Sequence, residues 1–157
     1  MNKDLRKPFF NSLIKLAKAD KSIILLVGDL GYSFMEEFAE RFPDQFINCG
    51  IAEQNMIGVA SGLAMMGKKP YCYSGSIFLI MRAYEQVRDD VCYNNTNVKL
   101  IGTGASPFLG FSHNLSREEN EEDLLKNLPN IQRFYPKNEQ ELKQAMKLNN
   151  KPTFIRL

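Results

Sequence analysis

The chain has 157 residues and a formal net charge of only +2, with 44% hydrophobic and 24% charged residues. This length suits one domain of ordinary size, and the composition is that of a globular protein. The small net charge argues against a nucleic-acid-binding protein, and no apolar stretch approaches the roughly 20 residues of a membrane span. The polar start, residues 1–6, lacks the pattern of a secretory signal. We therefore expect a single domain over residues 1–157 with no membrane and no nucleic-acid partner.

The cysteines give no sign of a disulfide framework or of a metal site. There are three of them, Cys49, Cys72 and Cys92, so the number is odd and the spacing is too wide for a metal knuckle. Buried, reduced thiols are the simplest interpretation, and they predict a cytoplasmic protein. We expect no metal ligands from this chain.

The first predicted elements are two helices on either side of an apolar strand. Apolar residues at helical spacing predict a helix over residues 8–19. The continuous apolar run 23–27 is typical of a strand that is buried on both faces. A second helix is expected over residues 33–41, with Ser33 as its N-cap and Glu36 completing a capping box.

The central elements continue the alternation of strands and helices. A short strand is expected over residues 46–48, followed by a helix that begins near Glu53 and ends near residue 66, where Gly67 provides a C-cap. A strand over 70–74 and a long helix over 77–93 come next.

The last part of the chain repeats this alternation after one long loop. A strand is expected over residues 98–101, followed by a loop over 102–116. The remaining predicted elements are a helix over 118–127, a strand over 132–135, a helix over 139–148 and a strand over 153–156. Regular alternation predicts an α/β protein with three layers, α/β/α, around a mostly parallel sheet.

Three polar segments follow predicted strands directly. They are Asp29, Glu53 and the 102–116 loop. Because ligands bind at the carboxyl ends of strands in open parallel sheets, we expect all three segments to lie at one edge.

The segment Gly50-Ile51-Ala52-Glu53-Gln54-Asn55-Met56 places a carboxylate in the first turn of a helix that is rich in small and apolar residues. Burying a carboxylate is costly unless a partner hydrogen-bonds to it, so Glu53 should have such a partner. A simpler alternative is a glutamate that only interacts with the positive end of its own helix. The small residues on this helix permit close approach to another surface, such as a second subunit.

This heptapeptide, together with Asp29 and the segment 82–86 (Arg-Ala-Tyr-Glu-Gln), closely resembles the pyrimidine-binding domain of transketolase and of 1-deoxyxylulose-5-phosphate synthase. The resemblance runs from about Leu26 to Leu157. It implies the thiamine diphosphate-binding fold and an enzyme that transfers aldehyde or ketone residues.

The resemblance also assigns roles to individual residues. Glu53 would be catalytic and would share a proton with the pyrimidine ring of thiamine diphosphate, which favours the imino form of its exocyclic amine. Asp29 and the following Leu30 would lie near the thiazolium ring, and Phe78 would stack on the pyrimidine. Arg82 is assigned to the same cofactor-binding set, although its segment is mainly scaffold in the family. Alternatives remain: Asp29 could be a turn cap and Phe78 an ordinary core residue.

The only histidine, His113, matches a family loop in the segment Gly110-Phe111-Ser112-His113, where the imidazole contacts the sugar substrate. We therefore include His113 as a catalytic candidate, with a surface histidine without function as the alternative. The chain departs from the family at Gly75, Met81 and Leu109, where an aromatic residue, a tyrosine and an aspartate are common. These differences leave the donor and acceptor sugars open.

The diphosphate-binding half of the family's site is absent from this chain. Its signature, Gly-Asp-Gly followed later by Asn, does not occur in the 157 residues. We therefore expect a split subunit that is active only with a separate partner, which holds the diphosphate and Mg²⁺. A homodimer or a heterotetramer is the expected assembly.

The function implied is transfer of a two-carbon ketol unit between sugars or sugar phosphates by a two-component transketolase-like enzyme. Two alternatives stay open. One is another thiamine diphosphate carboligase, similar to deoxyxylulose-phosphate synthase, and the other is a non-catalytic assembly or regulatory domain.

Overall fold

The centre of the protein is a sheet of six strands, and each pair of neighbouring strands is parallel. The computed structural model describes residues 4–104, 118–147 and 150–157. The strand order in the sheet is β2-β1-β3-β4-β6-β5. The strands are β1 (Ile23–Val27), β2 (Phe46–Asn48), β3 (Lys69–Gly75), β4 (Lys99–Thr103), β5 (Gln132–Phe134) and β6 (Thr153–Arg156). The predicted α/β fold with a parallel sheet is confirmed.

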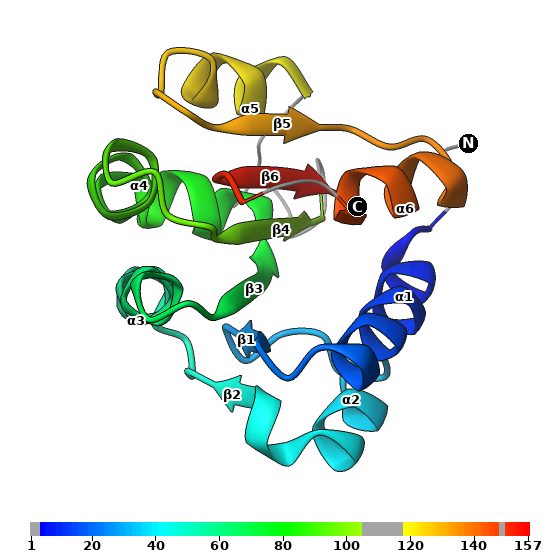
Figure 1. Cartoon of the computed structure of the whole chain (residues 1–157). Helices are drawn as coiled ribbons and strands as arrows, with labels where there is room; N and C mark the ends of the chain where they lie inside the picture. Colours follow the sequence, from blue (N-terminus) through cyan, green and yellow to red (C-terminus); the bar gives the residue numbers. More distant parts are fainter. Residues whose placement is uncertain (1–3, 105–117, 148–149) are drawn as a thin grey trace.

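Helices cover both faces of this sheet (Figure 1). One face carries α1 (Arg6–Ala19), α2 (Glu36–Arg41) and α6 (Glu139–Lys147), and the 3-10 turn η1 (Pro43–Gln45) leads into β2. The other face carries α3 (Glu53–Met65), the π-helical segments η2 (Phe78–Arg82) and η3 (Val87–Tyr93) with α4 (Tyr84–Gln86) between them, and α5 (Glu118–Leu125). Within the described ranges, no helix has both the length and the apolar character needed to span a membrane.

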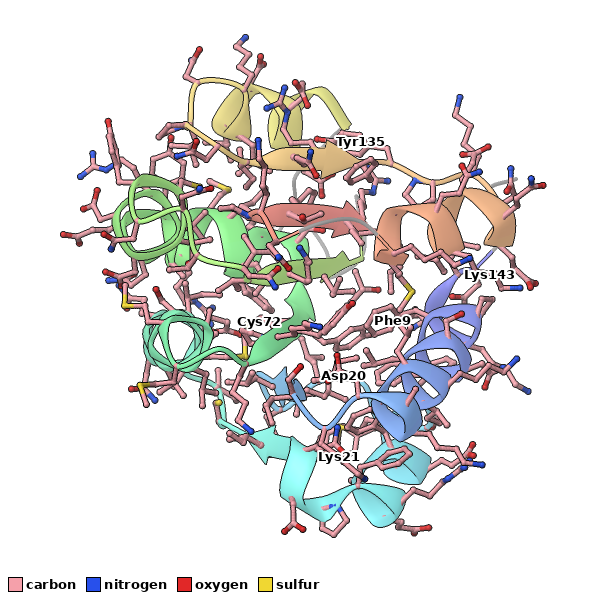
Figure 2. All side chains as sticks on the ribbon, in the orientation of Figure 1. Phe9, Asp20, Lys21, Cys72, Tyr135 and Lys143 are labelled. Atoms are coloured by element: carbon pink, nitrogen blue, oxygen red, sulfur yellow. The ribbon has the colours of Figure 1, made fainter. Side chains whose placement is uncertain are left out.

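Alternation along the strands divides the interior into two cores. In β1, Leu25 and Val27 pack toward α1, whereas Leu26 packs toward α3. Figure 2 shows the same division, with Phe9 on the α1 side of the sheet and Cys72 on the α3 side. A continuous apolar strand is therefore explained by burial on both faces.

The cysteines are free, as expected, with Cys72 and Cys92 buried and Cys49 partly buried. Burial raises the pKa of all three thiols. These thiols are therefore protonated at neutral pH and pack as small apolar side chains.

Two element predictions need correction. The second helix begins at Glu36, not at Ser33, because Ser33 has a left-handed backbone with φ of 72° that an α-helix excludes. Half of the predicted capping box is nevertheless present, since the Ser33 N–H donates to Glu36 Oε1 at 2.8 Å. The predicted single helix over 77–93 is instead the π-helical segment η2, the short α4 and the π-helical segment η3. The interruption lies at Ala83, which leaves helical geometry with φ of −103° and ψ of 25°.

A buried lysine lies at the start of β4, at the edge of the sheet opposite the strands' carboxyl ends. Lys99 is 4% exposed, and its Nζ donates to the Lys151 carbonyl at 2.7 Å and to Thr153 Oγ1 at 3.1 Å. Burial lowers the pKa of Lys99 from 10.5 to about 8. The folded state therefore opposes the charged form of this side chain.

We predict that Lys99→Met changes how stability depends on alkaline pH. Between pH 8 and 10.5 the unfolded chain binds a proton on Lys99 that the folded chain does not, so wild-type stability from this group rises with pH. The free-energy cost of keeping Lys99 charged in the folded protein is fully present below about pH 8, and it lowers the stability by about 3 kcal/mol at most. The difference in unfolding free energy between Lys99→Met and wild type should thus favour the variant most at pH 7 and shrink by pH 10.5. Urea unfolding of both proteins measures it, and parallel pH profiles would contradict this assignment.

Candidate active site

The carboxylate of Glu53 is buried where α3 begins, behind the carboxyl ends of the central strands. Its side chain is only 1% exposed. Oε1 accepts a hydrogen bond from Ser74 Oγ of β3 at 3.0 Å, and Oε2 accepts one from Arg82 Nη1 of η2 at 2.8 Å. These contacts run to neighbouring elements, so Glu53 is more than a charge placed at the end of its own helix.

The end of β1 approaches the same carboxylate closely at Gly28. A Cβ atom at this position would lie 3.0 Å from Ser74 Oγ and 3.1 Å from Glu53 Oε1. The absence of a side chain at Gly28 therefore lets β1, β3 and α3 meet around one oxygen atom. Sequence reasoning missed Ser74, although a serine near the end of a predicted buried strand was an available signal.

Phe78 and Arg82 form the outer part of the group. The Arg82 Cζ atom lies 4.3 Å from the centre of the Phe78 ring, which is a cation–π contact. Both residues belong to the π-helical segment η2, and π turns are rare and often occur at functional sites. The Phe78 ring also lies against Gly75, where a Cβ would be 3.0 Å from Phe78 Cδ2. A side chain at position 75 would therefore crowd the Phe78 ring in its present position.

Asp29 lies at the same edge of the sheet but in a separate group. Its φ of 53° is left-handed, a conformation that aspartate tolerates better than most residues. Oδ1 accepts hydrogen bonds from the Tyr32 hydroxyl at 2.6 Å and from Asn48 Nδ2 at 3.1 Å. The Tyr32 hydroxyl, and then the Asn48 amide, hold the pKa of Asp29 below its ordinary value. Asn48 thereby joins the end of β2 to the end of β1, a link that the sequence pattern does not show.

The predicted site residues are thus only partly brought together. Glu53 contacts Arg82, which in turn contacts Phe78, whereas Leu30 is partly buried and packs against the core on the α1 face. His113 lies outside the described residues.

Glu122 and Asp123 of α5 form hydrogen bonds and ion pairs with residues outside the Glu53 group. Arg133 Nε donates to Glu122 at 2.9 Å, the Tyr135 hydroxyl donates to the same carboxylate at 3.2 Å, and Asp123 pairs with Lys126. The first two contacts hold α5 to β5 and to the residue that follows it.

A buried acceptor, an aromatic face and parallel strands that end at one edge define an α/β ligand-binding domain. Over residues 2–157 the chain matches the family described as transketolase, pyrimidine binding domain. The protein belongs to this family.

Individual relatives support the same family. The chain is 31% identical over 156 residues to a subunit of the apulose-4-phosphate transketolase of Phocaeicola vulgatus, covering 97% of this chain and 50% of that protein. It is 37% identical over 131 residues to 1-deoxy-D-xylulose-5-phosphate synthase of Bacillus cereus, covering 83% of this chain and 20% of that protein. A solved structure described as a split gene transketolase, inactive beta4 tetramer, superposes with a TM-score of 0.84 at 35% identity, over 97% of this chain and 50% of that one. The chain thus spans half the length or less of these relatives.

Family membership implies thiamine diphosphate, and the residues present fit its aminopyrimidine ring. That ring is flat, and its ring nitrogen can share a proton with a carboxylate. Glu53 offers a buried oxygen acceptor, and Phe78 offers an aromatic face close to it. A planar group that donates hydrogen bonds, the Arg82 guanidinium, already makes both contacts at 2.8 Å and 4.3 Å.

We predict that Gly28→Ala destabilises the protein by roughly 1–3 kcal/mol. The added Cβ would displace the side chains of Ser74, which lies in a strand, and of Glu53, which is held in an ion pair. The matched control is Gly62→Ala in α3, where a Cβ would meet nothing within 4 Å. That substitution should instead stabilise the protein by roughly 0.5–1 kcal/mol through helix propensity. Urea unfolding of both variants tests the opposite signs. Equal effects would mean that the close approach at Gly28 does not constrain the site.

Proposed function

We propose that this chain is the pyrimidine-binding subunit of a two-component, thiamine diphosphate-dependent, transketolase-like enzyme. The enzyme transfers a two-carbon ketol unit between sugars or sugar phosphates. The observation that carries this proposal is the carboxylate of Glu53, 1% exposed and held next to the aromatic ring of Phe78 through Arg82.

Each proposed site residue has a role toward one part of the cofactor or the sugar substrate. Glu53 holds a proton shared with the pyrimidine ring nitrogen, Ser74 fixes the other oxygen of that carboxylate, and Phe78 supports the ring by stacking. Asp29 and Leu30 lie at the thiazolium end, and His113 donates to the sugar. The cofactor, when bound, supplies the acidic carbon that carries the ketol unit.

We propose that the partner is a separate diphosphate-binding subunit, which also holds Mg²⁺. Exposed apolar side chains on and beside α3 support such an interface. They are Ile51 at 76% exposure, Val59 at 39%, Met65 at 61%, Met66 at 82%, Met81 at 48% and Tyr93 at 67%. Exposed large apolar side chains are a common feature of subunit contacts. A heterotetramer with two copies of each chain fits this arrangement, and a homodimer is expected without the partner.

Two alternatives to transketolase activity remain. The similarity to 1-deoxy-D-xylulose-5-phosphate synthase favours a carboligase that acts on pyruvate, and a product assay with pyruvate distinguishes it. A non-catalytic assembly domain would bind the partner without turnover. The free thiols of Cys72 and Cys92 support the proposal of a reducing, cytoplasmic location.

We predict that Glu53→Gln in the assembled enzyme lowers turnover about 10²–10⁴-fold, because Gln keeps the volume but cannot share the proton. The direct measurement is hydrogen–deuterium exchange at the thiazolium carbon of bound thiamine diphosphate. The matched control is Glu40→Gln, the same change at an exposed position of α2.

Exchange in Glu53→Gln that is as fast as in wild type would mean that Glu53 does not activate the cofactor. His113→Ala should behave differently, since it should weaken turnover of the sugar while leaving exchange at the thiazolium carbon unchanged.

We predict that Val59→Asp on α3 prevents assembly with the partner while the isolated chain stays folded, because a charge would be buried at the interface. Asn11→Asp, which adds the same charge to exposed α1 on the opposite face of the sheet, should assemble normally. Analytical ultracentrifugation of each variant with and without the partner reads out the result. Normal assembly of Val59→Asp would exclude this face as the interface.

A further inference from the structure

Arg82 already makes the two contacts that the proposed function assigns to the aminopyrimidine ring. Its guanidinium donates to Glu53 Oε2 at 2.8 Å and lies with its Cζ 4.3 Å from the centre of the Phe78 ring. We infer that Arg82 is an autoinhibitory latch, which occupies the pyrimidine pocket of the chain and must leave before thiamine diphosphate can bind. The inference rests on the proposed function and concerns regulation of that same site.

The two oxygens of the Glu53 carboxylate have different partners. Oε1 accepts a hydrogen bond from Ser74 Oγ at 3.0 Å and lies close to the backbone of Gly28, where a Cβ would approach that oxygen to 3.1 Å. Oε2 is the oxygen that Arg82 occupies. A ring nitrogen that hydrogen-bonds to this carboxylate therefore competes directly with the guanidinium.

The difference in exposure places Arg82 on the outside of the pocket. The Glu53 side chain is 1% exposed, whereas the Arg82 side chain that bonds to it is 39% exposed. A ligand that arrives from solvent meets Arg82 before it meets Glu53. The long, partly exposed arginine side chain can rotate away without unfolding its segment, because its backbone lies in η2 and the contacts to Glu53 and Phe78 are made by the guanidinium.

A guanidinium is well suited to this exchange because it is planar, carries several N–H donors and stacks on aromatic faces. An aminopyrimidine is likewise planar and stacks on aromatic faces, and its ring nitrogen donates to a carboxylate when it carries the shared proton. The exchange replaces one hydrogen-bonded, stacked group by another. The cost to the ligand is the partly exposed ion pair and the cation–π contact that it must displace.

The test is the affinity of thiamine diphosphate, with Mg²⁺, for the complex of this chain with its diphosphate-binding partner, measured by calorimetry. Arg82→Met should bind about tenfold more tightly than wild type, since no group then competes for Glu53 and Phe78. The matched control is Arg88→Met, which removes an exposed arginine from the neighbouring η3 and should equal wild type. Arg82→Lys keeps a charge near Glu53 but not the planar group, so it should bind more tightly than wild type and less tightly than Arg82→Met.

The outcomes separate this inference from the proposed function. If wild type binds thiamine diphosphate and Arg82→Met binds equally or more weakly, the latch is wrong; weaker binding would make Arg82 the cofactor ligand predicted from the sequence. If neither wild type nor any variant binds, the proposed function itself fails and the latch fails with it. Should Arg82→Met not fold, Arg82→Lys decides the question by the same comparison with wild type.

Discussion

The buried carboxylate of Glu53 is the constraint on which the rest of the site depends. A carboxylate with 1% exposure needs hydrogen-bond donors, and the fold supplies them from two different elements, Ser74 in β3 and Arg82 in η2. The parallel sheet makes this possible because the ends of β1 and β3 and the start of α3 meet at one edge. Gly28 then sets how closely they approach.

Much of the fold could be predicted because its signals are local. The run Ile23–Val27 is apolar without interruption, so a strand buried on both faces followed from composition alone, and its observed bounds agree. The C-cap at Gly67 is similarly local, since its φ of 81° suits glycine. The prediction that the helix begins at Ser33 was wrong because a capping motif does not reveal the left-handed turn that precedes α2. Hydrogen bonds from the Phe34 and Met35 amides to the Gly31 carbonyl close that turn.

The candidate site was predicted as a set of residues but not as a set of contacts. Glu53, Phe78 and Arg82 were identified by resemblance, yet nothing in the sequence showed that the arginine would bond to the glutamate. That pairing depends on the π-helical geometry of η2 and on the space left by Gly75 beside the Phe78 ring. Ser74 and Asn48 were missed for a related reason, because their roles come from strand neighbours that are distant in sequence.

One helix connects the chemistry of the proposed enzyme to its assembly. Glu53 stands in the first turn of α3, while Val59 on the same helix and Met66 directly after it are exposed. A partner that covers these apolar side chains would fix the helix that carries the carboxylate. Met81, 48% exposed, directly precedes Arg82, so the same contact would reach the residue that closes the pocket. On the proposed interface and the proposed role of Arg82, assembly and access to Glu53 would be coupled through adjacent residues, without a long-range change in the sheet.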